Sequence, residues 1–291
     1  MNPLFKKMLC FSFAIISSVT CHQLVAQDVH EKNDLRVMSF NIRYGSASDG
    51  DNHWDQRHKH VIATIQQFSP DLLGTQEVLG FQADYLQQNL SDYHYVGRSR
   101  ENKPAGEQCG ILVRKQHFDV LESGHFWLSE TPNVPGSKSW DSSLPRMASW
   151  VKIFDRRNES TLYFVNTHFD HRGENARRES AKVILARVSK FEQGIPVILV
   201  GDFNTAPDSA PHKLLTQEMS DTFDSLHPDE KIQGTFNGFR SQKDGKRIDF
   251  VFASPSWTIV AAEIDRTEFD GKNSSDHYPV TSILRFAKEE P

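Results

Sequence analysis

Short apolar runs separated by polar segments recur along the chain, and they predict a protein rich in β-strands. Residues that favour turns, mainly Gly, Asn, Asp and Pro, stand between the runs. The predicted strands are 35–42, 71–76, 109–114, 148–154, 161–168, 196–202, 247–253 and 278–286. No repeat or low-complexity tract interrupts this pattern, so we expect one domain over residues 34–287.

A helical pattern appears in a few longer segments between the predicted strands. In the first of them, Val61, Ile65 and Phe68 are spaced so that they fall on one face of a helix. The segment 129–145 is instead rich in Pro, Ser and Gly, which predicts a long surface loop. Loops of that length in compact domains are often functional. The predicted helices are 55–68, about 79–90 and 174–191.

Polar side chains mark the carboxyl ends of several predicted strands. Asn41, Glu77 and His168 each end or directly follow an apolar run, and Asp202 and Asn204 follow the buried-looking run "VILVG". One Asp or Asn after a strand is usually a turn residue whose side chain bonds neighbouring backbone N–H groups. The repetition of the pattern points to more, because it gathers carboxylate, amide and imidazole groups at the rim of the sheets.

Two further acidic groups lie near the C-terminus. Asp249 stands between Ile248 and Phe250 in a strand that looks buried, where an unpaired carboxylate would be costly, so a charged or protonated partner is implied. Asp276 and His277 open the last predicted strand, and by themselves they are compatible with a local ion pair.

The residue types favour one kind of chemistry. Carboxylates and amides with few nitrogens and no cysteines suit Mg²⁺, Mn²⁺ or Ca²⁺ better than zinc. Such an ion polarises a phosphoryl oxygen while a carboxylate activates water. HExxH, GxSxG, Walker and GxGxxG motifs are absent from the sequence, which removes the main competing chemistries. The residues alone therefore predict a metal-assisted hydrolase.

The first 26 residues have the anatomy of a secretory signal peptide. Lys6 and Lys7 precede an apolar run that is too short for a convincing membrane span. We expect cleavage before Gln27, and lipidation at Cys21 is the alternative, although Thr precedes that cysteine where a small residue is usual. The mature chain is then exported to the periplasm or the extracellular space, without stable insertion in a membrane.

Charge and cysteine content refine this picture. Removing the leader and its two lysines leaves 31 basic against 38 acidic residues, a net charge of −7. That balance argues against a protein that coats nucleic acid without specificity. Cys109 becomes the only cysteine, so an internal disulfide is excluded. A signal peptide without disulfides suggests a bacterial envelope protein.

Six short motifs, taken in order, resemble the endonuclease/exonuclease/phosphatase superfamily of metal-dependent phosphoesterases, and within it a bacterial secreted branch. Each motif is weak alone, but the six in this order are specific, and they extend from residue 35 to about 286. The resemblance implies an α/β (α+β) fold, a four-layer α/β/β/α sandwich in which two mixed β-sheets pack face to face. The motifs are "SFNIRY", "LLGTQEV", "NTHFDH", "VGDFN", "RIDFVF" and "SDHYPV".

The resemblance also implies roles for the residues at the predicted metal and water sites. Glu77 would be the principal ligand of Mg²⁺ or Mn²⁺, Asn41 would lie close to the metal and the phosphate, and Asp276 would supply a second ligand. Asp202 would orient or deprotonate the attacking water, and Asn204 would hold that water or a phosphate oxygen.

Further roles follow from the same resemblance. Asp249 would pair with His277, which answers the burial problem raised above. His168 would contact the phosphate or assist the leaving group, and Glu107, on a neighbouring strand, would orient that histidine.

Four residues near these motifs keep two interpretations each. Arg43 and Arg172 match the geometry of phosphate oxygens and are candidate substrate ligands, yet an exposed arginine needs no function. Trp127 and Trp140 flank or lie in the predicted loop, where they either stack on a base or sugar or pack the loop down.

We therefore expect a monomeric, divalent-metal-dependent hydrolase of phosphate esters, a phosphodiesterase or a phosphatase, in the bacterial envelope. A phosphorylated small molecule, sugar or nucleotide is the favoured substrate, because the acidic charge and the lack of a basic run disfavour nucleic acid. The alternative is a secreted nuclease acting on DNA or RNA. An alternative of another class is a binding module that has lost catalysis, which would leave gaps in the acid, amide and histidine set.

Overall fold

The computed structural model describes residues 33–101 and 103–287. The first sheet has the strand order β11-β14-β1-β2-β4-β3 and is mixed, with β1 and β2 parallel and the other neighbours antiparallel. Its strands are β1 (Leu35–Asn41), β2 (Leu72–Val78), β3 (Tyr93–Val96), β4 (Gln108–Arg114), β11 (Trp257–Ile264) and β14 (Val280–Phe286). The predicted signal peptide, its cleavage site and Cys21 lie outside the described residues.

The second sheet has the order β5-β6-β7-β8-β10-β9 and repeats the plan of the first. Here β7 and β8 are parallel, and the other neighbours are antiparallel. Its strands are β5 (Phe118–Trp127), β6 (Met147–Asp155), β7 (Ser160–His168), β8 (Val197–Asp202), β9 (Ser220–Asp221) and β10 (Asp249–Ala253).

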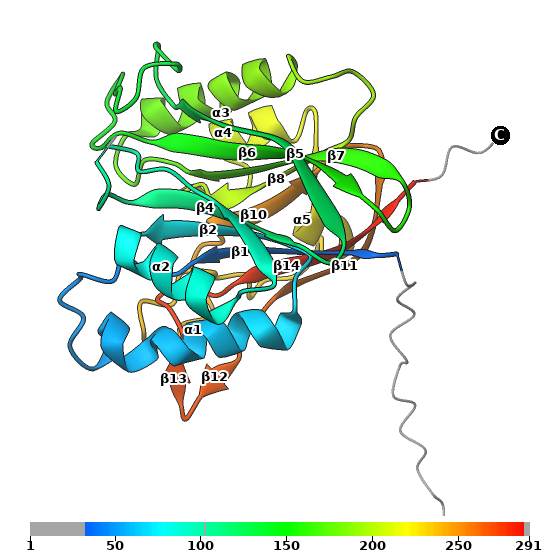
Figure 1. The fold of residues 1–291 in the computed structure, drawn as a ribbon. Helices are drawn as coiled ribbons and strands as arrows, with labels where there is room; N and C mark the ends of the chain where they lie inside the picture. The colour runs from blue at the N-terminus through cyan, green and yellow to red at the C-terminus, as the bar shows by residue number, and fades with distance from the viewer. Residues whose placement is uncertain (1–32, 102, 288–291) are drawn as a thin grey trace, which may run out of the picture. The chain divides into compact units, whose positions relative to one another are not determined.

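Helices cover the outer face of each sheet (Figure 1). The helices α1 (Trp54–Phe68) and α2 (Gly80–Asn89) lie against the first sheet, and α3 (Glu174–Val188) and α4 (Ala210–Leu215) lie against the second. The remaining short elements are the 3₁₀ turn η1 (Gly50–Asn52), α5 (Thr222–Leu226), β12 (Glu268–Phe269) and β13 (Lys272–Asn273). The predicted four-layer α/β/β/α sandwich is confirmed.

Three apolar layers hold the sandwich together, and the middle one lies between the sheets. Val37 and Leu72 of the first sheet join Phe164, Ile198 and Val200 of the second in one buried cluster. Separate clusters join each sheet to its helices. Burying apolar side chains on both faces of a strand requires apolar residues at nearly every position, which explains the continuous runs in the sequence.

Each sheet contains one β-α-β crossover, and these crossovers place the polar strand ends. The helix α1 connects β1 to β2, and α3 connects β7 to β8, so the carboxyl ends of both parallel pairs lie at one rim of their sheet. In the second sheet the register sets Asp202 opposite both His168 and Asp249.

The predicted strands and helices are all present, with ends shifted by a few residues, and 129–145 is a loop as predicted. Strands β3, β5, β9, β11, β12 and β13, the 3₁₀ turn η1 and helices α4 and α5 were not predicted. Of the helices in residues 33–287, none is both long and apolar enough to cross a lipid bilayer.

Candidate active site

The polar strand ends of both sheets line one cavity of about 550 Å³. Glu77 reaches it from β2, His168 from β7 and Asp202 from β8, while Asp276 and His277 enter from the segment before β14. The cavity is lined by Arg43, Tyr44, Glu77, Arg100, Glu107, Leu144, Arg146, His168, His171, Asp202, Asn204, Phe236, Ile248, Asp276 and His277.

Asn41 connects the two sheets at the floor of this region. Its Nδ2 donates to Oε1 of Glu77 at 3.2 Å and to Oδ2 of Asp202 at 3.0 Å, and its Oδ1 accepts from the backbone N–H of Arg43 at 3.0 Å. The fully buried amide therefore holds two carboxylates from different sheets in fixed positions. The predicted role of Asn41 close to the metal stays a prediction.

Three residues of the site have left-handed backbone conformations. The φ angles are 63° at Glu77, 58° at Arg43 and 49° at Asn204, values that are uncommon for residues other than glycine. At Glu77 the conformation accompanies an irregularity in the pairing of β2 with β4 between Thr75 and Val78. The turn directs the Glu77 carboxylate so that its Oε2 accepts from the backbone N–H of Tyr44 at 3.0 Å. Strain of this kind concentrates at functional sites.

The predicted pairing of Asp249 with His277 is present. Oδ2 of Asp249 lies 2.9 Å from Nδ1 of His277, and Nε2 of that ring lies 3.8 Å from Oδ2 of Asp202. Burial alone would lower the pKa of His277, but the charges of Asp249 and Asp202 outweigh it and raise this pKa well above its ordinary value. Burial and the charge of Asp249 raise the pKa of Asp202 to about 7. His277 is thus held as a cation that faces a carboxylate able to accept a proton.

His168 has the opposite electrostatic environment. Burial, followed by the charges of Arg146 and Arg100, lowers the pKa of His168 well below its ordinary value. Its Nε2 lies 3.1 Å from Nδ2 of Asn204 and 3.5 Å from Oδ2 of Asp202. A neutral ring that accepts from the amide of Asn204 fits both observations.

The donor set suits a divalent cation. Glu77, His168 and Asp202 each offer one ligand atom, and these atoms lie within 4.8 Å of one another. Oxygen donors outnumber nitrogen, as Mg²⁺ and Mn²⁺ prefer. Asp276 also lines the cavity, but its Oδ2 lies 3.6 Å from Nε of Arg43. Arg43 in turn forms two hydrogen bonds to Asp49, of 3.0 and 2.9 Å, so its guanidinium is committed to carboxylates in this structure.

Two predicted site residues have surroundings that differ from those expected. Glu107 lines the cavity, and its carboxylate accepts from Nη2 of Arg100 at 2.5 Å, because the segment before β4 folds back and brings Arg100 alongside. Its predicted role in orienting His168 stays a prediction. The side chain of Arg172 is exposed and is not among the residues that line the cavity. Its phosphate-binding role has no geometric support.

Of the two interpretations of Trp127 and Trp140, the structure favours packing over stacking on a substrate. Trp127 is buried, and its Nε1 donates to the backbone carbonyl of Arg100 at 2.6 Å, so it fixes the chain beside the cavity. Trp140 is half-buried in the loop and does not line the cavity.

Several cavity residues escaped sequence reasoning. Arg100 and Arg146 are both buried, and Tyr44 and His171 are the last residues of the motifs "SFNIRY" and "NTHFDH". Phe236 is 45% exposed, and its ring packs against the ring of His277. The position of Arg146 in the cavity could have been predicted from the strand order. Arg146 directly precedes β6, which runs antiparallel to β7, so it must lie near His168 at the end of β7.

A second cluster of similar composition lies outside the cavity. Oδ2 of Asp221 is 2.9 Å from Nε2 of His212, and the fully buried Arg247 donates to the same carboxylate at 2.8 and 3.0 Å and also to Asp224. A buried guanidinium already neutralises these carboxylates, so this cluster does not fit a cation.

Comparison with solved structures identifies close relatives of the fold. A mannosyl-6-phosphatase of Bacteroides thetaiotaomicron VPI-5482 is 32% identical, with a TM-score of 0.81 over 87% of this chain and 100% of the other. TDP2 of D. rerio, solved with a single-strand DNA product, is 18% identical, with a TM-score of 0.71 over 87% and 99% of the two chains. The second comparison shows likeness of fold only.

Comparison with curated sequences finds relatives as well. The Drosophila melanogaster protein angel is 22% identical over 228 residues, which cover 72% of this chain and 63% of that protein. The chain thus spans less than two thirds of the length of the curated relatives it matches first. The model of one family, described as the endonuclease/exonuclease/phosphatase family, matches residues 38–277. On this match, the chain belongs to the endonuclease/exonuclease/phosphatase family and is a hydrolase acting on ester bonds.

Proposed function

We propose that the chain is a divalent-metal-dependent phosphoesterase whose substrate is a small phosphorylated compound, such as a sugar phosphate or a nucleotide, and whose metal is Mg²⁺ or Mn²⁺. One observation carries the proposal. A carboxylate pair, a neutral histidine and a cationic histidine converge on a bounded cavity of about 550 Å³, which is the size of a small-molecule site. The similarity to a mannosyl-6-phosphatase supports a small substrate.

The residues divide the chemistry between them. Glu77 and Asp202, with His168 beside them, would hold the cation, which when bound polarises the phosphoryl group and neutralises its charge. Asp202 accepts a proton from the attacking water, and Asn204 orients that water or a phosphoryl oxygen. The water oxygen forms the new bond to phosphorus as the bond to the leaving oxygen breaks.

The two histidines have different tasks because their charges differ. His277, kept cationic by Asp249, donates a hydrogen bond to a phosphoryl oxygen and stabilises the charge that develops there. His168, kept neutral, adds no charge beside the phosphoryl group, and its ring is held by the amide of Asn204. Asn41 serves both carboxylates by fixing their separation.

The test is hydrolysis by the purified chain with Mg²⁺, Mn²⁺ or EDTA. The panel contains sugar phosphates, nucleoside monophosphates, small phosphodiesters, and single- and double-stranded nucleic acid. We expect metal-dependent turnover of small phosphate esters that exceeds turnover of nucleic acid. A Glu77→Gln variant should lose this activity, whereas Asp224→Asn, in the second cluster, should keep it. Faster cleavage of DNA or RNA would favour the nuclease alternative, and neither turnover nor metal binding would favour a non-catalytic module.

We also propose that the protein is exported, on the strength of the leader in residues 1–26. The test is fractionation of a bacterial host that expresses the full chain, followed by N-terminal sequencing. A mature end at Gln27 in the periplasm or medium supports export. A lipid-modified Cys21 supports anchoring, and an intact leader in the cytoplasm contradicts both.

A further inference from the structure

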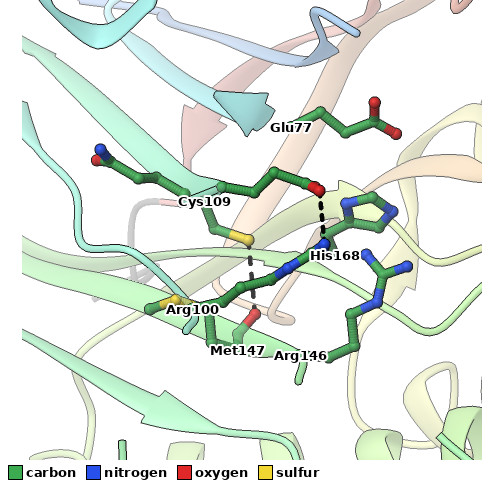
Figure 2. A pocket seen from close by; sticks show the side chains of 8 residues that line it. Glu77, Arg100, Cys109, Arg146, Met147 and His168 are labelled. Atoms are coloured by element: carbon green, nitrogen blue, oxygen red, sulfur yellow. Dashed lines mark hydrogen bonds and ion pairs between the residues drawn. The ribbon is translucent and has the colours of Figure 1, made fainter. Parts of the chain in front are cut away.

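A small niche opens beside the cavity, between β4, β6 and β7. Its volume is about 10 Å³, which is room for one water molecule or one oxygen atom. We call it the arginine niche and define it by Glu77, Arg100, Glu107, Arg146 and His168, which line both it and the cavity. Figure 2 shows Arg100 and Arg146 side by side, with His168 and Glu77 nearby.

Arg146 carries hydrogen-bond donors that the protein leaves unused. Its side chain is only 4% exposed, yet Nε and Nη1 have no hydrogen-bond partner among the described residues. Asp170 lies 3.5 Å from Nε, in ion-pair contact but without a hydrogen bond, and Nη2 lies 3.0 Å from Nδ1 of His171. Buried donors are nearly always satisfied, so these two point to a ligand.

Arg100, in contrast, is already paired. Its Nε lies 3.1 Å from Glu101 and its Nη2 lies 2.5 Å from Glu107, and its backbone carbonyl is held by Trp127. Glu77 and Glu107 also border the niche, but the carboxylate of Glu107 is already paired with Arg100. The unused donors are those of Arg146, and the ligand that fits them is one oxygen acceptor, bound most strongly when it carries negative charge.

We propose that Arg146 binds a terminal oxygen of the substrate's phosphoryl group, and that the arginine niche thereby selects phosphomonoesters over phosphodiesters. The inference rests on the proposed function and deepens it. During in-line displacement three substituents lie around phosphorus, between the attacking and leaving oxygens. All three are bare oxygens in a monoester dianion, whereas a diester carries a carbon on one of them and has a single charge. In the proposed mechanism the cation and His277 each take one of the three, so only a monoester leaves a bare oxygen for a niche that admits one atom.

The test compares two substrates that share a leaving group, p-nitrophenyl phosphate and bis(p-nitrophenyl) phosphate. In Arg146→Met, we expect kcat/KM for the monoester to fall by about 100-fold, because charge-assisted hydrogen bonds are lost. The diester should change by less than about fivefold, so the ratio of the two collapses. Arg146→Lys keeps the charge but lacks the planar guanidinium, so its kcat/KM for the monoester should lie between those of the wild type and Arg146→Met. Arg178→Met, which removes an exposed arginine of α3, is the matched control.

An equal fall for both esters, or a wild-type preference for the diester, would overturn the inference while leaving phosphoesterase activity intact. Absence of metal-dependent turnover of every ester would instead count against the proposed function. In that case calorimetry, which measures the binding of inorganic phosphate and of dimethyl phosphate, still tests the role of Arg146. Loss of phosphate binding alone in Arg146→Met supports the niche, and unchanged binding of both refutes it. If Arg146→Met fails to fold, Arg146→Lys carries the same comparison.

Discussion

The active-site cluster Asp202–Asp249–His277 and the second cluster His212–Asp221–Asp224 have the same composition. Each combines one histidine with two aspartates whose ligand atoms lie within 4.8 Å of one another. Each contains a histidine-to-aspartate contact of 2.9 Å. A search by residue type and distance would therefore give both the same chemistry.

Their surroundings separate them. Arg247, whose side chain is 0% exposed, pairs with both aspartates of the second cluster, and that cluster does not border the cavity. The active-site cluster contains no arginine, and Oδ1 of its Asp249 has no hydrogen-bond partner among the described residues. Counter-charge and access therefore decide which of two similar clusters can do chemistry, and which one holds the fold together.

The largest effect is expected in the second cluster. Arg247→Met leaves Asp221 and Asp224 without their cation, so the free energy of unfolding should fall by about 3 to 5 kcal/mol. Urea unfolding with EDTA measures this, and Arg178→Met, at an exposed site, should change it by less than about 0.5 kcal/mol. The variant that remains folded at low temperature should keep its turnover. Loss of turnover without loss of stability would show that the second cluster takes part in catalysis.

Substitution in the active-site cluster should lower turnover and leave stability unchanged or higher. In Asp202→Asn, we expect kcat to fall by two or more decades, about 3 kcal/mol in barrier height, because the proton acceptor is lost. Stability should hold or rise, since a buried carboxylate that faces Asp249 is removed. Parallel measurement of kcat and urea unfolding tests both halves. A large loss of stability with normal kcat would show that Asp202 is structural.

Metal binding should distinguish the clusters next. At a free Mg²⁺ or Mn²⁺ concentration one hundred times Kd, binding to the native state adds about 2.7 kcal/mol to the free energy of unfolding. We expect Glu77→Gln to lose this increment and Asp224→Asn to retain it. The measurement is urea unfolding with the metal and with EDTA. An increment lost only in Asp224→Asn would place the metal in the second cluster.

The smallest effect concerns pH in the metal-free protein. Because the pKa of Asp202 rises from 3.8 to about 7 on folding, its contribution is fully present below pH 3.8 and is lost as pH rises toward 7. Burial alone would raise the pKa of Asp221, but the hydrogen bond from His212 and the charge of Arg247 lower it, so its contribution is fully present above pH 3.8 and is lost as pH falls below that value. Each pKa unit corresponds to about 1.4 kcal/mol.

The measurement is the difference in unfolding free energy between wild type and Asp202→Asn, or wild type and Asp221→Asn, from pH 3 to 8. The two differences should change in opposite directions with pH. Curves of the same sign would mean that the two carboxylates have similar environments after all.

The central strands and their polar ends could be predicted because both signals are local. A strand buried on both faces requires an apolar run, and Asn41, Glu77, His168 and Asp202 interrupt or end such runs. Edge strand β5 was not predicted because its sequence shows neither an apolar run nor a regular alternation of apolar and polar residues. Leu121 and its polar neighbours are exposed, and a bulge follows Val120.

The arginines of the niche could not be predicted for another reason. Arginine in a sequence indicates the surface, and only the meeting of β4, β6 and β7 buries Arg100 and Arg146. The same limit applies to Glu107. Its partner Arg100 is seven positions earlier in the chain, and the fold-back that joins them has no apolar signature.

The left-handed backbone at Glu77, Arg43 and Asn204 has a consequence for how this protein can evolve. Such conformations cost of order 1 kcal/mol or more each for residues with a side chain, a strain that glycine would relieve. Glycine would also remove the Glu77 carboxylate and the Asn204 amide from the cavity. Relief of backbone strain and retention of the site's polar groups therefore oppose each other at these positions.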